Sequence, residues 1–242
     1  MLDATEAFAI HNLKYGDTSL ISYCFTEKYG LRSFMLKGIL SGKRKAIKKS
    51  LFQPMSHIEI VAQFRDNQNL SFIKEAKLVA PHSSIPFDVR KNALVLFLSE
   101  ILYQVLREEG APNGALFEFI KNAFVWLDKN DSIANFHIKF LLELTRFMGF
   151  YPNIENDNHP YFNLESGSTT HLLPRGRYLE STLKNKWISI LGTNFDKSLN
   201  VSLNKLERSS LIEHIIFYFG VHLQNFKNPR STAVLNEVFK HF

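Results

Sequence analysis

The sequence predicts an α+β protein in which a small barrel of strands is followed by a helical domain. Two observations predict this order. Apolar and polar residues alternate at the period of a strand through residues 1–80, and apolar residues recur at helical spacing through residues 81–242. Between the two patterns, Pro81 and Pro86 lie in a short segment without strand character, as is typical of a linker. We therefore expect a domain boundary between residues 80 and 81.

Strands are expected in the first domain at residues 6–13, 19–25, 31–37, 56–64 and 70–78. Turns containing Gly16 and Gly30 join the first three strands as hairpins, and the polar residues 65–69 join the last two. Five strands with a longer excursion after the third match the inventory of an OB-fold β-barrel. The same five strands would also suit an open sheet.

The second domain is predicted to be all-α. Its first helix ends near Gly110, and further helices cover about residues 115–127, 133–147, 180–191, 203–224 and 231–239. Asn113 is the expected N-cap of the second helix, and Asp131 with Ser132 is expected to cap the third. An irregular insertion at about residues 150–180 interrupts the helices, with short strands predicted at residues 161–164 and near residues 171–173.

The composition is that of a water-soluble globular protein. Apolar residues make up 45% of the chain, and no run of 18 apolar residues occurs. Asp3 and Glu6 stand where a signal peptide needs positive charge, so we expect a cytoplasmic protein with no membrane partner. The single cysteine, Cys24, excludes an internal disulfide and a cysteine-based zinc cluster, and its apolar strand predicts a buried, inert thiol.

Positive charge is concentrated in the first third of the chain. The net charge is +6, and residues 1–80 hold twelve Lys and Arg against seven Asp and Glu. Residues 81–242 hold seventeen against sixteen, so the helical domain is nearly neutral. Six positive side chains and no acid lie within residues 37–49, where like charges repel one another until a polyanion binds. We therefore predict a DNA-binding site formed by Lys37, Lys43, Arg44, Lys45, Lys48 and Lys49.

Residues on the neighbouring strands are candidates for the same site. Arg32 would extend the positive surface, and Tyr29 suits either base stacking or packing against the protein. Phe34 and Tyr23 are expected in the core. The competing interpretation is that residues 37–49 form only a solvated loop, but the flanking glycines and the absence of acids favour a binding site.

A second basic spot lies in the irregular insertion. Arg175 and Arg177 flank a glycine there, and they are our candidate partner-binding residues. The pair would suit DNA or an acidic peptide of a partner protein. An exposed loop with incidental charge explains it equally well.

The sequence contains no recognisable catalytic or metal-binding constellation. It lacks the glycine-rich phosphate loop and the serine nucleophile elbow. His159 and His171 share the insertion with three acids, but their spacing matches no compact ligand pattern. We therefore expect neither a metal nor any other cofactor, and we expect that the protein is not an enzyme.

Several short motifs carry a family resemblance: residues 15–21 (YGDTSLI), 26–31 (TEKYGL), 37–38 (KG) with 42–45 (GKRK), 51–54 (LFQP) and 229–235 (PRSTAVL). Their order, with the change from strands to helices at residues 81–86, resembles the bacterial RecO family of recombinational repair proteins. The resemblance implies an OB-fold domain followed by a helical domain. It implies binding of single- and double-stranded DNA, annealing of complementary strands and help in placing RecA on coated DNA. It also implies partnership with RecR and with the tail of single-strand-binding protein.

The insertion departs from the pattern of many family members, which carry two CxxC pairs there. Residues 150–180 contain no cysteine, so a structural zinc is not expected and another interaction must order the segment. The expected function is that of a DNA-repair mediator without enzymatic activity. Two alternatives stay open: a protein-interaction scaffold whose basic loop meets an acidic partner, and an enzyme concealed in the helical domain.

Overall fold

The computed structural model of the chain describes residues 2–41, 47–64 and 70–239. Contacts group the chain into two compact units, Met1–Asp128 and Lys129–Phe242. The elements of the first unit are β1 (Leu2–Tyr15), β2 (Ser19–Thr26), β3 (Gly30–Leu36), η1 (Lys49–Phe52), β4 (His57–Gln63), β5 (Ile73–Ala80), η2 (Ile85–Phe87), α1 (Val89–Glu109) and α2 (Gly114–Lys129). Strands give way to helices at residues 81–88, as the sequence predicts.

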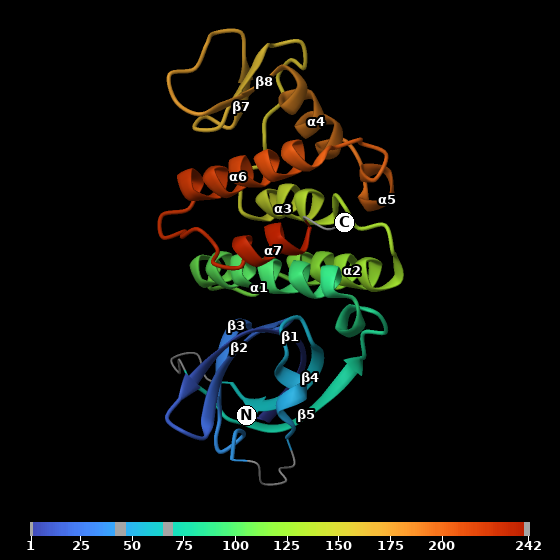
Figure 1. The fold of residues 1–242 in the computed structure, drawn as a ribbon. Coiled ribbons are helices and arrows are strands. Elements are labelled where there is room, and N and C mark those ends of the chain that lie inside the picture. The colour runs from blue at the N-terminus through green and yellow to red at the C-terminus, as the bar shows by residue number, and fades with distance from the viewer. Residues whose placement is uncertain (1, 42–46, 65–69, 240–242) are drawn as a thin grey trace. The chain divides into compact units, whose positions relative to one another are not determined.

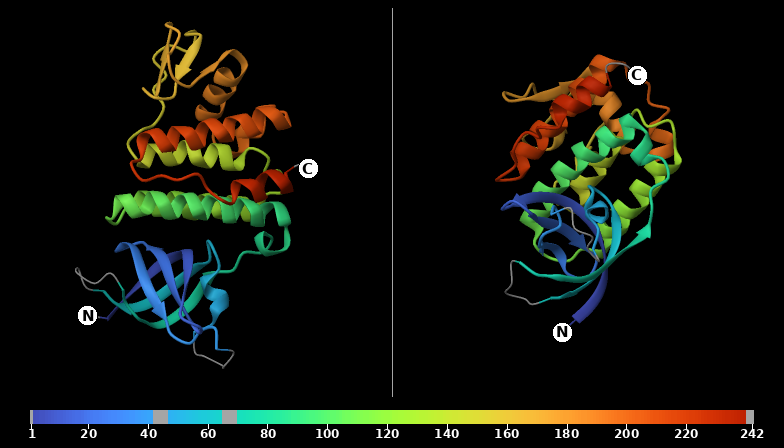
Figure 2. Two further views of the ribbon diagram at one scale, coloured as in Figure 1. Left: turned by 60° about the vertical axis from the view of Figure 1, so that its left-hand side comes forward. Right: turned by 60° about the horizontal axis from the view of Figure 1, so that its bottom comes forward.

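The five strands form one antiparallel sheet in the order β3-β2-β1-β4-β5. The sheet curls so that its outer strands approach each other (Figures 1 and 2). They meet at a single parallel bridge between Phe34 of β3 and Ser71, just before β5. The result is an OB-like, partly open barrel, which agrees with the predicted α+β fold class.

The interior of the barrel is filled by apolar side chains that range in size from alanine to phenylalanine. Ala7, Ala9, Cys24, Phe34 and Ile60 are all buried in this cluster. Alternation along β1 turns Phe8 to the opposite face, where its ring lies 5.1 Å from that of Phe117 in α2. Helix α2 therefore covers the outer face of β1, and the middle of this strand, residues 7–10, is buried on both sides. The predicted burial of Cys24 and Phe34 is confirmed, and burial raises the pKa of the Cys24 thiol to about 12.

The segment that joins the sheet to the helices is held by one carboxylate. Asp128, at the end of α2, accepts hydrogen bonds from the backbone N–H groups of Ser83, Ser84 and Ile85 at 2.7, 2.8 and 3.0 Å. Partial burial opposes ionisation of Asp128, but these bonds outweigh it and hold the pKa of the carboxyl below its usual value. The linker is thereby fastened to the far end of α2.

The loop between α1 and α2 lies against the second hairpin of the sheet. Asn113 caps α2 by accepting a hydrogen bond from the N–H of Leu116 at 2.9 Å, which confirms the predicted cap. Gly30 begins β3 with a φ of +68°, and a Cβ built on it would lie 2.8 Å from the carbonyl oxygen of Ala111. Only glycine combines this backbone conformation with this approach.

The second unit contains α3 (Phe136–Phe147), β6 (Tyr161–Asn163), β7 (Ser168–Thr170), β8 (Tyr178–Glu180), α4 (Ser181–Leu191), α5 (Phe195–Ser198), α6 (Lys205–His222) and α7 (Thr232–Val238). The predicted irregular insertion contains a small three-stranded sheet with the order β7-β6-β8, whose strands have three residues each. Phe162 of this sheet packs against Trp187 of α4 and Tyr218 of α6. The buried ammonium of Lys184 donates to the carbonyl oxygens of Asp157 and His159.

Two local predictions in this unit are wrong. Helix α3 begins at Phe136, and its N-cap is Asn135 instead of Asp131 or Ser132. The amide of Asn135 donates to the carbonyl oxygens of Ser198 and Val201, so a tertiary contact fixes where the helix starts. The strand predicted near residues 171–173 lies at residues 168–170, because these residues pair with β6 while the leucines beyond them are exposed.

We expect Gly30→Ala to destabilise the protein more than Gly16→Ala. Both glycines have a positive φ, but a Cβ at Gly16 meets nothing within 4 Å. Gly16→Ala should cost about 1–2 kcal/mol through backbone conformation alone. Gly30→Ala should cost more, because backbone atoms of Ala111 must also move. Urea unfolding of both variants measures the difference, and equal losses would contradict the close approach.

We expect Asp128→Ala to lower the free energy of unfolding by about 1–3 kcal/mol at neutral pH, because three backbone N–H groups, two of them in part-buried hydrogen bonds, lose their charged acceptor. The pKa of Asp128 is lower in the folded state than in the unfolded chain. Its contribution is therefore complete above the unfolded value of about 3.9 and is lost as the pH falls through the folded value. Urea unfolding at pH 7 and pH 3 should show the difference from wild type shrinking in acid. Asp17→Ala, at an exposed turn, is the control.

Candidate nucleic-acid interface

A groove of about 260 Å³ lies where the C-terminal end of β3 meets the start of β5. Its floor is apolar and its edges carry two lysines. The lining residues are Met35, Leu36, Lys37, Ile39, Ile47, Phe72, Ile73 and Lys74. We call this feature the Phe72 groove.

The exposure of Phe72 follows from the hydrogen bonding of its neighbour. Ser71 is buried, its N–H donates to the carbonyl of Ser33 at 3.0 Å, and its carbonyl accepts from the N–H of Met35 at 2.8 Å. Since successive side chains of an extended chain point to opposite sides, Phe72 must point outward. Its side chain is 55% exposed, and the ammonium of Lys37 lies 4.8 Å from the centre of its ring.

Two exposed lysines line the groove, and two more follow its lining residue Ile47 in the chain, all without an acidic partner among the described residues. Lys37, Lys48, Lys49 and Lys74 form no ion pair within the described residues. By contrast, Lys77 of β5 pairs with Glu59 of β4 at 2.8 Å, in the adjoining part of the surface. An unpaired ammonium group gains more from an incoming phosphate than a paired one does, because no existing attraction is lost. The four lysines therefore form a cationic surface, of the kind that attracts anions.

The structure brings together only part of the predicted DNA site. Lys37 lines the groove, and Lys48 and Lys49 are exposed beside Ile47, which also lines it. Lys43, Arg44 and Lys45 lie outside the described residues, so their contribution stays a prediction. Arg32 lies nearer the start of β3, opposite Cys24, and its half-buried side chain has an Nε without a hydrogen-bond partner in the described part of the chain.

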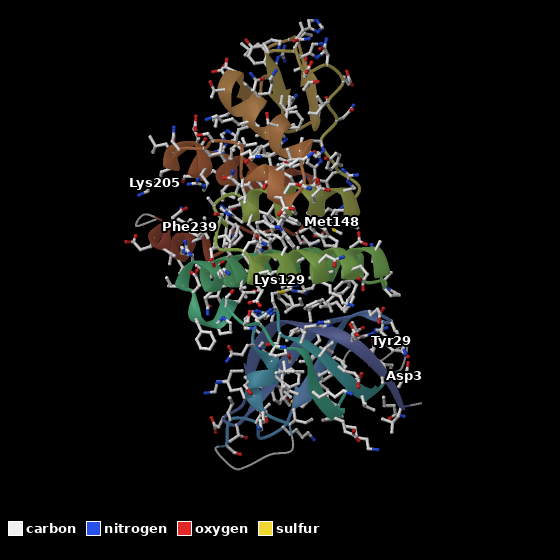
Figure 3. The ribbon with its side chains drawn as sticks, turned by 90° about the vertical axis from the view of Figure 1, so that its right-hand side faces the viewer. Asp3, Tyr29, Lys129, Met148, Lys205 and Phe239 are labelled. Atoms are coloured by element: carbon white, nitrogen blue, oxygen red, sulfur yellow. The ribbon has the colours of Figure 1, made fainter. Side chains whose placement is uncertain are left out.

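Tyr29 lies at the opposite end of β3 from Lys37, on the order of 20 Å away along an extended strand. Its hydroxyl donates to Asp3 at 2.7 Å, and its ring stacks on Phe64 with 3.9 Å between centroids (Figure 3). The same carboxylate pairs with Lys28 at 3.2 Å. The hydrogen bonds from Tyr29 and Lys28 lower the pKa of Asp3. The polar groups at this end of the barrel are therefore already paired with a carboxylate of the protein itself. Base stacking by Tyr29 stays a prediction.

The arginines of the insertion are exposed but not alone. The guanidinium of Arg177 lies 4.8 Å from the ring centre of Phe217 in α6. The carboxylate of Glu165 lies against Gly176, between Arg175 and Arg177, since a Cβ there would overlap its oxygens. This acid reduces the positive potential of the spot. Partner binding by the two arginines stays a prediction.

A second cleft, of about 220 Å³, opens in the second unit between α3, α6 and α7. Its apolar lining comes from Leu206, Ile212, Leu235 and Phe239, and Lys205 and Arg208 add positive charge (Figure 3). Burial, and then the charge of Arg208, lowers the pKa of His137 to about 3, so this imidazole is neutral.

The cleft is matched to a ligand that is partly apolar and partly anionic. Arg208 donates from Nη2 to the carbonyl of Leu203 at 3.1 Å, while its Nε is buried without a partner among the described residues. Burial lowers the pKa of its guanidinium, which is the sign of a positive charge that lacks full solvation. Leu206 is 81% exposed at the mouth of the cleft. We call this feature the α6–α7 cleft.

Two further results concern metals and membranes. In the described ranges, no three side chains of His, Cys, Asp or Glu are grouped so that they could hold a metal ion. The rings of His159 and His171 lie 5.8 Å apart, centre to centre, without such a group around them. Among the described residues, no helix has both the length and the apolar character needed to cross a bilayer.

Sequence reasoning missed Phe72 and Lys74. Both alternate on one face of the strand predicted at residues 70–78, directly after the polar turn. An aromatic residue two positions before a lysine, at the start of a strand, was the available signal. Without knowing that this strand meets β3, its proximity to Lys37 could not be inferred.

The fold and the groove together define an OB-like protein with a cationic surface beside an exposed aromatic ring. Two models of the Recombination protein O family match the chain, the N-terminal one over residues 1–82 and the C-terminal one over residues 86–231. The chain therefore belongs to the RecO family.

Full-length relatives support the same assignment. DNA repair protein RecO of Flavobacterium psychrophilum is 40% identical over 237 residues, which cover 97% of this chain and 98% of the relative. The proteins of the same name from Christiangramia forsetii and Bacteroides fragilis are each 37% identical, over 239 and 244 residues. These alignments cover 99% of this chain and 100% of each relative.

Proposed function

We propose that this protein is a DNA-repair mediator that binds single- and double-stranded DNA and anneals complementary strands. Four unpaired lysines around the Phe72 groove carry this proposal, since such a surface attracts a polyanion. The chain belongs to the RecO family, and its relatives are named DNA repair proteins, so we infer that the polyanion is DNA. Each phosphate that meets a lysine releases condensed counterions, which favours binding.

Annealing follows from charge neutralisation without a chemical step. Two DNA strands repel each other through their phosphates, and lysines that neutralise some of this charge lower the repulsion. The strands can then approach closely enough to pair. We propose accordingly that the protein is not an enzyme, and purified protein incubated with Mg²⁺ should leave labelled DNA uncut.

The proposal extends to partner proteins. We infer that the protein acts with RecR and helps to place RecA on single-stranded DNA coated by single-strand-binding protein; family membership supports this part. The α6–α7 cleft supports a site for the tail of single-strand-binding protein, which ends in acids and an aromatic residue. Its apolar lining would hold the aromatic ring, and Lys205 and Arg208 would meet the carboxylates.

We expect the variant with Lys37→Gln, Lys48→Gln and Lys49→Gln to bind DNA more weakly and with a shallower salt dependence. Each phosphate contact contributes roughly 0.7 to 0.9 to the slope of log K against log salt concentration, so the slope should fall by about two to three. Titration of a fluorescent oligonucleotide at several salt concentrations measures this slope. The rate at which complementary oligonucleotides anneal should fall in the same variant.

The matched control is Lys28→Gln with Lys77→Gln, which removes cations already paired with Asp3 and Glu59. Its slope should change by less than one. If the triple variant kept wild-type DNA affinity and lost an acidic partner protein instead, the surface would belong to a protein-interaction scaffold.

We expect Leu206→Asp to weaken binding of a peptide with the tail sequence of single-strand-binding protein by at least about tenfold. The new carboxylate would repel the acidic peptide at the mouth of the cleft, and because Leu206 is exposed the substitution should leave the fold intact. Fluorescence anisotropy of the labelled peptide measures the affinity. Val221→Asp, exposed at the other end of α6, should have no effect, and equal losses would exclude the cleft as the site.

A further inference from the structure

We infer that the Phe72 groove holds one unpaired nucleobase, stacked on the ring of Phe72, and that this contact distinguishes single-stranded from double-stranded DNA. The inference rests on the proposed function and names the part of the ligand that the groove recognises. Lysines alone bind phosphates of either form of DNA, so another contact must supply any preference between them.

The ring of Phe72 is presented to solvent on a fixed backbone. Both hydrogen bonds of Ser71 tie the preceding residue to β3, and Ile73 begins the β5 ladder immediately afterwards. The backbone is thus fixed on both sides of Phe72, whose ring is 55% exposed. The ring therefore cannot become buried through a change in backbone conformation. Aromatic rings held in this way on OB-like sheets are suited to stacking with bases, which tolerates any sequence.

The remaining walls suit a flat apolar group next to an anion. Leu36, Ile39 and Ile47 supply apolar surface, while Lys37 and Lys74 stand at the edges. The groove has a volume of about 260 Å³, below the range of about 300–1,000 Å³ that is typical of pockets for drug-sized ligands. A single small ring system is therefore the ligand that matches its size. A nucleotide combines such a ring with a phosphate, and the ammonium of Lys37 already lies 4.8 Å from the centre of the Phe72 ring.

Only an unpaired base can use this site. In a duplex, both faces of a base are covered by its neighbours, so the Phe72 ring has no face to meet. A base stacked on Phe72 keeps its hydrogen-bonding edge free, because stacking occupies the face alone. The bound strand can therefore still pair with a complementary strand. Base stacking within the new duplex then competes with stacking on Phe72.

The test compares Phe72→Ala with wild type on a thymidine oligonucleotide and on a relaxed, covalently closed circular duplex, which has neither ends nor loops. The affinity for the oligonucleotide should fall about 5- to 140-fold, which corresponds to the measured range for stacking of one base on an aromatic ring. The affinity for the closed duplex should change by less than about twofold. Phe87→Ala removes another exposed aromatic ring of the same unit and should leave both affinities unchanged.

A second variant reports the contact directly. Phe72→Trp should keep its affinity for the oligonucleotide, and its fluorescence, corrected with wild-type protein for the two native tryptophans, should be quenched by the oligonucleotide but not by the closed duplex. Equal losses on both DNAs in Phe72→Ala, or unchanged affinity with unquenched Phe72→Trp, would overturn the inference.

The proposed function is tested separately by the lysine variant. If that variant loses DNA affinity while Phe72→Ala keeps it, the DNA site stands and the base pocket fails. If Phe72→Ala instead changes only the oligomeric state seen by size-exclusion chromatography, the ring packs against a second copy and the inference also fails.

Discussion

Two backbone hydrogen bonds between Ser71 and β3 determine where the Phe72 groove forms. They join the two outer strands of the sheet at one point, and so they bring the start of β5 beside the end of β3. Residues that are about 35 positions apart in the sequence, Lys37 and Phe72, come into contact as a result. The same bonds fix which side chains point outward, because the alternation of an extended chain starts from a buried Ser71.

The distribution of acids then decides which part of the barrel can bind an anion. At the start of β3, Asp3 already engages Tyr29 and Lys28, and on β4 Glu59 engages Lys77. The lysines around the Phe72 groove have no such partners in the described part of the chain. Net charge alone would not reveal this difference. The second unit combines charge and apolar surface in another way, in a cleft between helices whose cations adjoin exposed and buried leucines.

The sequence was sufficient to predict the fold class, because it depends on local patterns. Alternation gave the five strands to within a few residues, and the cap at Asn113 was recognised from residue type and position. Features set by distant contacts were not predictable in this way. The start of α3 depends on carbonyl groups of residues 198 and 201, and the groove depends on the pairing of β3 with Ser71. Lys37 was found from its charged neighbours, whereas Phe72 looked like any other residue of a strand.

The ammonium of Lys184 carries a consequence for the small sheet of the second unit. It gathers the carbonyl oxygens of Asp157 and His159, while Phe162 anchors the same segment between Trp187 and Tyr218. All the groups that make these contacts belong to the polypeptide chain itself. None of these contacts involves a thiol or a metal-ligand bond, so chelating agents and thiol oxidation do not act on them directly.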